Sequence, residues 1–128
     1  MSTTTAELVA EAKASVENLN PEQVTQELIR GALVVDLREP AEVDGGRIEG
    51  SVHAPRGMLE FYADPTSPYH RAEFDPSRRT VLYCASGGRS ALAAVTLDRL
   101  GYTDVAHLDG GMKAWSAGGF PVTTPAGG

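Results

Sequence analysis

The chain has 128 residues, of which 41% are hydrophobic and 22% are charged. Globular domains usually contain about 100–150 residues, so this length predicts one domain. Seventeen acidic residues against eleven basic ones give a formal net charge of -6, which argues against a nucleic-acid partner, because the phosphate backbone attracts basic proteins. Cys84 is the only cysteine, which excludes an internal disulfide and a metal site built from several cysteines.

The expected cellular location follows from the same composition. A single free thiol fits a reducing compartment, so we expect a cytoplasmic protein. The first residues lack the basic and apolar segments of a signal peptide, and no run approaches the roughly 18 apolar residues of a membrane span. We therefore expect no membrane partner.

Two helices are predicted at the start of the chain. Apolar residues recur at helical spacing within residues 5–18: Leu8, Val9, Ala12 and Val16. They predict an amphipathic helix over that range. Asn20 is a suitable N-cap and Pro21 suits the first helical position, which predicts a second helix from Pro21 to Arg30.

The rest of the chain alternates strands with helices. Short apolar runs predict strands at residues 32–37, 80–83 and 105–108, and a weaker signal predicts one at 51–54. Helices are expected over residues 89–100 and 112–117. This alternation predicts an α/β fold with a mostly parallel sheet.

The segment 56–79 contains three prolines but also four aromatic residues: Phe61, Tyr62, Tyr69 and Phe74. A disordered linker would not carry them, so we expect this segment to be ordered. Residues 58–62 are predicted to form a short helix, which either lines a binding pocket or seals the core.

Cys84 follows a predicted strand at the point where sites form in open parallel sheets. Mostly small residues lead from it into the next helix: Ala85, Ser86, Gly87, Gly88, Arg89 and Ser90. The glycines allow the backbone N–H groups to converge on one point, and the helix N-terminus adds a partial positive charge there. Both effects favour an anion and the thiolate form of Cys84, which makes it a candidate nucleophile. The alternative is that Cys84 is a small buried hydrophobic residue.

Three separated motifs occur in a characteristic order: Asp36-Leu37-Arg38-Glu39-Pro40, the Cys84–Ser90 loop, and Gly110-Gly111-x-x-x-Trp115. With these motifs the chain closely resembles the rhodanese family over residues 19–122. The resemblance implies a single rhodanese domain, with helices on both faces of a mostly parallel central sheet. Residues 1–18 then form an N-terminal helical extension and residues 123–128 a flexible tail. The chain departs from the family at residues 46–50, where Gly-Arg-Ile-Glu-Gly replaces the usual Gly-His-Ile-Pro-Gly.

The resemblance implies a sulfurtransferase. Cys84 would take a sulfane sulfur from thiosulfate or a persulfide donor, hold it as a persulfide, and pass it to cyanide or a thiol, without a cofactor or a metal. Cys84 to Arg89 spans six residues, as in relatives that bind sulfur compounds, whereas phosphatase-like relatives have one more. The second hypothesis is a sulfur carrier or regulatory module that works with a protein partner and turns over small molecules slowly. A phosphatase or arsenate reductase is the third.

The roles of the loop residues are predicted as follows. The backbone N–H groups of residues 85–89 hold the anionic sulfur. Arg89 either attracts the donor or braces the loop by pairing with a carboxylate. Asp36 is expected to be that carboxylate and to support the loop. Ser90 either contacts the loop or the sulfur, or only caps the helix.

Other side chains receive roles by their position in the chain. Arg56 is expected near the loop as a second group that attracts anions; the alternative is a solvated arginine. The histidines have no metal-site spacing, and His107 is expected to face either solvent or a polar partner. Trp115 is expected to pack the last helix onto the sheet.

Overall fold

The computed structural model describes residues 2–124. Its main sheet has five strands in the order β1-β6-β5-β2-β4, and every neighbouring pair is parallel. Their bounds are β1 Glu17–Leu19, β2 Leu33–Asp36, β4 Val52–His53, β5 Thr80–Tyr83 and β6 Val105–Leu108. A separate antiparallel pair consists of β3 (Arg47–Ile48) and β7 (Val122–Thr123). The expected α/β fold with a mostly parallel sheet is confirmed.

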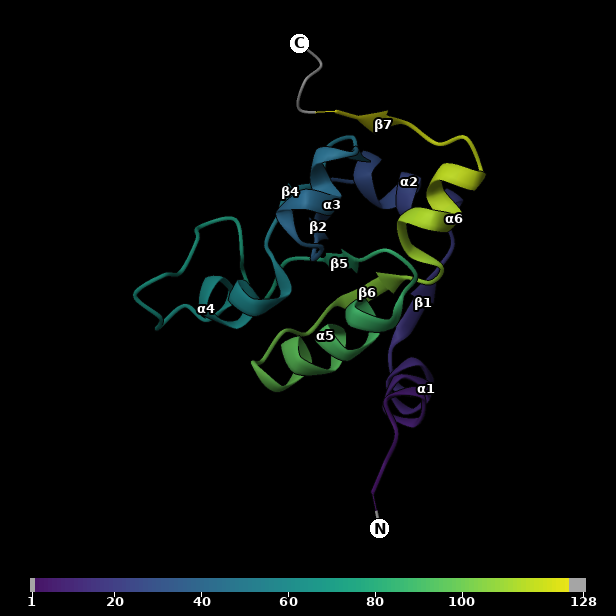
Figure 1. Ribbon diagram of the computed structural model, residues 1–128. Helices are drawn as coiled ribbons and strands as arrows, with labels where there is room; N and C mark the ends of the chain where they lie inside the picture. The colour runs from purple at the N-terminus through teal and green to yellow at the C-terminus, as the bar shows by residue number, and fades with distance from the viewer. Residues whose placement is uncertain (1, 125–128) are drawn as a thin grey trace.

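The helices cover both faces of the sheet. Their bounds are α1 Thr5–Ser15, α2 Pro21–Ile29, α3 Pro40–Asp44, α4 Leu59–Ala63, α5 Gly88–Arg99 and α6 Gly111–Ala117, with a 3-10 turn η1 at Arg56–Met58. Figure 1 shows α2 and α6 on one side of the sheet and α5 on the other. Among the described helices, residues 2–124, none is long and apolar enough to cross a bilayer.

The core is split by the sheet into two clusters. Alternate residues of a strand point to opposite faces, so Val35 and Leu82 pack against α4 and α5, whereas Val34 packs against α2 and α6. Trp115 of α6 is buried in the second cluster, as its predicted packing role requires. All four residues of β2 are buried, and so are all four of β5, as is typical of parallel strands covered on both faces.

The second predicted helix is confirmed almost to the residue. The Asn20 side chain accepts a hydrogen bond from the Gln23 N–H at 2.8 Å, and the Gln23 side chain accepts one from the Asn20 N–H at 2.8 Å. Pro21 occupies the first turn. The two reciprocal bonds satisfy N–H groups that a helix start leaves without partners.

The first predicted helix is too long. It ends at Ser15, and the residues expected to be its last turn form β1, the edge strand beside β6. Val16 keeps helical spacing but has an extended backbone, and the Asn18 amide donates to the carbonyls of Lys13 and Val16. These bonds and the pairing with β6 outweigh the helical pattern. The helix α1 itself packs against α5.

The segment 56–79 is ordered, as expected, and its short helix is α4. Leu59, Ala63 and Phe74 from this segment are buried in the cluster on the α5 face, so they seal the core. At the other end, Thr123 was expected in a flexible tail, but it pairs with Arg47 in the β3–β7 ribbon. Residues 125–128 of that tail lie outside the described residues.

Candidate active site

Cys84 lies between the end of β5 and the start of α5, and it is 1% exposed. Its Sγ accepts hydrogen bonds from the N–H of Gly87 at 3.2 Å and from the N–H of Ser90 at 3.4 Å. Burial raises the pKa of the thiol, but hydrogen bonds from the Ser90 side chain and from the N–H groups of Ser90, Gly87 and Ser86 outweigh it and lower the pKa overall. The loop therefore stabilises the thiolate, the nucleophilic form.

The start of α6 holds the loop in this shape from the opposite side. The carbonyl of Cys84 accepts from the Met112 N–H at 2.8 Å, and the carbonyl of Ala85 accepts from the Lys113 N–H at 3.0 Å. Gly111 makes this approach possible, because a Cβ there would lie 2.4 Å from the Cys84 oxygen. These contacts with α6 hold the loop in the shape in which the N–H groups of Gly87 and Ser90 donate to the sulfur.

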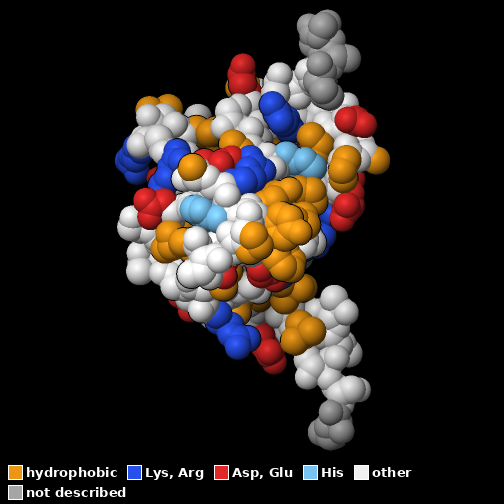
Figure 2. All heavy atoms as spheres, turned by 90° about the vertical axis from the view of Figure 1, so that its left-hand side faces the viewer, with side chains coloured by type: hydrophobic (Ala, Val, Ile, Leu, Met, Phe, Trp, Pro, Cys, Tyr) orange, Lys and Arg blue, Asp and Glu red, His pale blue; other side chains and the backbone are white. Residues whose placement is uncertain are grey.

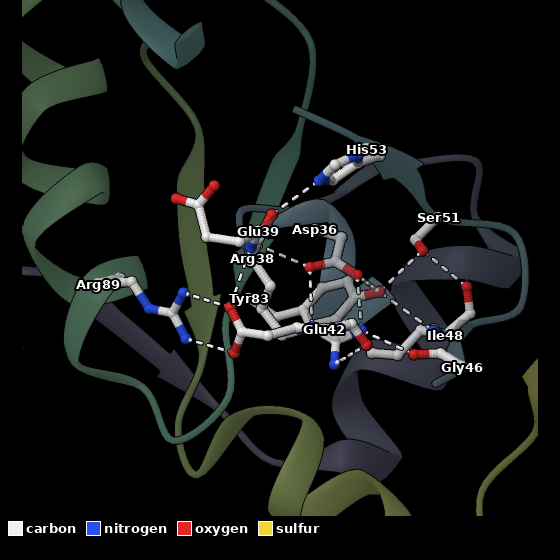
Figure 3. A network of polar contacts seen from close by, with 10 residues as sticks. All are labelled: Asp36, Arg38, Glu39, Glu42, Gly46, Ile48, Ser51, His53, Tyr83 and Arg89. Carbon is white, nitrogen blue, oxygen red and sulfur yellow. Dashed lines mark hydrogen bonds and ion pairs between the residues drawn. The ribbon is translucent and has the colours of Figure 1, made fainter. Parts of the chain in front are cut away.

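A buried ion pair lies at the end of β2, beside β5, the strand that leads into Cys84 (Figure 3). The Arg38 guanidinium donates to both carboxylate oxygens of Asp36, at 3.0 and 2.8 Å. The Tyr83 hydroxyl donates to Asp36 at 2.9 Å and accepts from the Ile48 N–H at 3.0 Å. Asp36 thus contacts the loop's neighbour Tyr83, the residue directly before Cys84.

The expected pairing of Asp36 with Arg89 is wrong. Arg89 instead forms a two-point ion pair with Glu42, at 2.8 and 3.0 Å (Figure 3). The carboxylate of Asp36 is already occupied by Arg38 and Tyr83, whereas Glu42 lies in the first turn of α3. The hydrogen bond from Arg89 is the main reason that the pKa of Glu42 falls to about 2. Pro40 followed by an acid two residues later is typical of a helix start, but this pattern does not indicate that Glu42 pairs with Arg89.

Arg56 does not take the position expected for it at the Cys84 loop. Its guanidinium pairs with Glu60 at 2.7 Å and contacts the hydroxyl of Thr96 at 3.5 Å, well along α5 from the loop. The carboxylate of Glu60 offsets the positive charge of Arg56, which weakens any attraction for an anion at this point.

Ser90 and His107 meet behind the sulfur. The Ser90 Oγ lies 3.6 Å from the Cys84 Sγ and 2.8 Å from the Nδ1 of His107. His107 is fully buried, so of its two expected surroundings the polar partner is the one found. Its place could have been anticipated from the strand order, because parallel pairing of β5 with β6 sets His107 opposite Leu82, two residues before Cys84.

A model of the rhodanese-like domain family matches residues 20–118. The chain is 33% identical over 114 residues to a sulfurtransferase of Allochromatium vinosum, covering 88% of this chain and 99% of that one. It is 32% identical over 111 residues to the thiosulfate sulfurtransferase GlpE of Pseudomonas aeruginosa, covering 87% of this chain and 93% of GlpE.

A solved structure from Rhodopseudomonas palustris, described as a protein of unknown function and possible tyrosine phosphatase, superimposes with a TM-score of 0.89. It is 38% identical and the match covers 96% of both chains. The fold, the cysteine loop and these relatives together define the class: the chain belongs to the rhodanese-like domain family, and the sulfurtransferases are among its relatives.

Proposed function

We propose that this protein transfers a sulfane sulfur from thiosulfate or a small persulfide, through a persulfide on Cys84, to cyanide or a thiol. One observation carries the proposal: the Cys84 sulfur lies at the start of α5 and accepts hydrogen bonds from the N–H groups of Gly87 and Ser90. Such a site stabilises a sulfur anion without a metal or cofactor, because the helix N-terminus and the N–H groups supply positive charge.

In the first half of the reaction, the Cys84 thiolate attacks the outer sulfur of thiosulfate. A new sulfur–sulfur bond forms, the original one breaks, and sulfite leaves with the electron pair. In the second half, cyanide attacks the terminal sulfur, thiocyanate leaves, and the thiolate is restored. This is covalent catalysis in two steps. The terminal sulfur of the intermediate carries a negative charge. We propose that the N–H groups of residues 85–89 stabilise this charge.

The side chains around the loop have supporting roles in this proposal. Arg89 braces the loop through Glu42, since a guanidinium held at two points by a carboxylate is fixed in place. Asp36 supports the loop through Tyr83. Because the reaction needs a free thiol, we propose that the protein works in a reducing compartment such as the cytoplasm.

The first test is thiocyanate formation from thiosulfate and cyanide, comparing the unmodified chain with Cys84→Ser. The unmodified chain should form thiocyanate and Cys84→Ser should form none. Ser116→Ala is the matched control: Ser116 is exposed on α6 and lies outside the cysteine loop, so the activity of this variant should be near that of the unmodified chain. Equal rates for the unmodified chain and Cys84→Ser would contradict the proposal.

A sulfur carrier that serves a protein partner is the second candidate. The observation that favours it is an exposed aromatic pair on the face that carries α4, where hydrophobic side chains gather (Figure 2). Phe61 and Tyr69 are 49% and 60% exposed and pack edge to face with ring centroids 6.2 Å apart. Exposed apolar patches often mark protein contacts. Slow turnover of thiosulfate with fast transfer to or from a partner protein would favour this candidate.

A phosphatase fits the site less well. Cys84 to Arg89 spans six residues, one fewer than in phosphatase-like relatives, and the Arg89 guanidinium is engaged by Glu42 rather than free to bind a phosphate. We expect no phosphate release from an aryl phosphate. Release that depends on Cys84 would overturn the sulfurtransferase assignment.

A further inference from the structure

A continuous line of polar contacts runs from Cys84 away from the loop and into the sheet. The Cys84 Sγ lies 3.6 Å from the Ser90 Oγ, which lies 2.8 Å from the Nδ1 of His107. The Nε2 of His107 lies 2.7 Å from the Oδ1 of Asn18. Ser90 and His107 are fully buried, and the line crosses from α5 through β6 to β1, the strand at the edge of the sheet.

The hydrogen bonds of Asn18 fix the direction of the protons along this line. Its Nδ2 donates to the carbonyls of Lys13 and Val16, at 2.9 and 3.0 Å, so its Oδ1 is the atom that faces His107. Because Oδ1 only accepts, the Nε2 of His107 carries a hydrogen and the Nδ1 of a neutral ring has a free lone pair. The Ser90 hydroxyl then donates to Nδ1, and its oxygen is left to accept the S–H of Cys84.

We propose that His107 takes up the proton of the Cys84 thiol through the Ser90 hydroxyl. The thiol proton passes to the Ser90 oxygen while the Ser90 proton passes to the Nδ1 of His107. The products are a thiolate, an intact serine hydroxyl and an imidazolium, so no oxidant or reductant is needed. The Ser90 hydroxyl now donates to the sulfur, the imidazolium Nδ1–H donates to Ser90, and the Nε2–H still donates to Asn18.

Burial favours the neutral form of the His107 ring, whereas the nearby Asp109 carboxylate favours the imidazolium that proton uptake would form. Burial lowers its pKa, the Asp109 carboxylate raises it, and the Lys13 ammonium lowers it, with a net shift downward. Lys13 from α1 and Asp109 from the end of β6 are themselves paired at 2.9 Å. A neutral ring with a free Nδ1 is the form that accepts a proton. His107 touches no reacting atom, so it acts as a positioning residue through Ser90.

The inference deepens the proposed function, because it rests on Cys84 acting as a thiolate. It also gives the N-terminal segment a role. Asn18 lies outside residues 20–118, which the family model matches, yet it sets the orientation of the histidine. The N-terminal segment therefore contributes a residue to the thiol's proton path and is more than an added helix.

The test measures how fast iodoacetamide alkylates Cys84 in the full chain as a function of pH, which reports the thiolate without requiring sulfur transfer. His107→Asn removes the base, and we expect its alkylation profile to move upward by about one pH unit, so that alkylation at neutral pH slows about tenfold. Asn18→Asp places a carboxylate on the Nε2–H, favours the imidazolium, and should move the profile to lower pH.

The alkylation profiles of His107→Asn and Asn18→Asp should shift in opposite directions. General damage to the loop would not speed alkylation in Asn18→Asp, so the two shifts together separate the proposal from such damage. His70→Asn is the matched control, since His70 contacts the Phe74 carbonyl far from the line, and its profile should equal that of the unmodified chain. Profiles of His107→Asn and Asn18→Asp that coincide with the unmodified chain would overturn the proposal. If His107→Asn does not fold, Asn18→Asp decides alone. Shifted profiles without thiocyanate formation would support the proton path and count against the proposed function.

Discussion

Arg89 and Glu42 are joined at two points, with Nη1 to Oε1 at 2.8 Å and Nη2 to Oε2 at 3.0 Å (Figure 3). This pair connects the first turn of α5, which carries the cysteine loop, to the first turn of α3. Its geometry uses the planar fork of a guanidinium, which a lysine ammonium does not reproduce. This contact is the observation from which we propose that Arg89 braces the loop.

If Arg89 acts as a brace, the geometry of the pair matters more than the charge of Arg89. We predict that Arg89→Lys and Glu42→Gln each lower kcat/KM for thiosulfate by about threefold to tenfold, and that the double variant is no worse than the poorer single variant. Steady-state kinetics of the four proteins measure this coupling. An increase in activity for Glu42→Gln would instead show that Glu42 withholds Arg89 from the donor.

The contribution of the Arg89–Glu42 pair to the stability of the fold should depend on pH. The pKa of Glu42 in the folded chain is about 2, below its ordinary 4.5, so its carboxylate stabilises the fold above pH 4.5 and this contribution is lost as pH falls toward 2. The side chains are about a third exposed, and solvent screening limits the contribution to about 1 kcal/mol or less.

Urea unfolding of the unmodified chain and Glu42→Gln measures that contribution. The difference between their free energies of unfolding should be constant above about pH 5 and should shrink as the pH falls toward about 2. Shifts at other carboxylates are shared by both proteins and cancel. A difference that persists unchanged at the lowest pH would contradict the assignment to Glu42.

The ion pair of Asp36 and Arg38 should be a major source of stability. Both side chains are almost fully buried, so Asp36→Asn leaves a buried guanidinium without its anion. We predict a loss of about 3 kcal/mol in the free energy of unfolding, measured by urea titration. Asp98→Asn on the exposed side of α5 is the control, and it should change stability by less than about 0.5 kcal/mol. Equal effects of the two substitutions would contradict the prediction.

Glycine should be required at position 111 for two reasons: the positive φ of this residue and its close approach to the cysteine loop. Gly111 and Gly119 both have positive φ, 56° and 73°. A Cβ at Gly111 would lie 2.4 Å from the Cys84 oxygen, whereas a Cβ at Gly119 would meet nothing within 4 Å among the described residues 2–124. Gly119→Ala should cost only the strain of positive φ, about 1 kcal/mol.

Gly111→Ala should cost more, because the loop must also move, and it should lower thiocyanate formation at least about tenfold through the displaced N–H groups. Thermal unfolding and the thiocyanate assay measure the two effects. Equal stability and equal activity of the two alanine variants would show that the close approach of Gly111 to Cys84 has no role.

Much of the fold can be predicted from short stretches of the sequence. The strands β2, β5 and β6 are continuous apolar runs, and Asn20 with Pro21 marks the start of α2. The strand β1 could not be predicted from local sequence, because Val16 continues a helical spacing and the strand depends on pairing with β6, far along the chain. The short strands β3 and β7 also depend on each other and carry no pattern of their own.

The candidate site divides in the same way. The position of Cys84 and the small residues after it follow from a strand, a turn and a helix that are adjacent in sequence. The partners of Arg89 and His107 could not be predicted in this way, because these partners lie far apart in the sequence and only the folded chain brings them together. Asp36 is held by Arg38 and Tyr83, and Arg89 pairs with Glu42 instead.

A persulfide on Cys84 is tested by the mass of the peptide that contains Cys84, measured after the reduced, folded protein has been treated with thiosulfate. We predict that this peptide gains the mass of one sulfur atom, that cyanide removes the sulfur with formation of thiocyanate, and that Cys84→Ser gains nothing. An unmodified Cys84 in the folded, reduced protein would contradict a persulfide mechanism with thiosulfate as the donor.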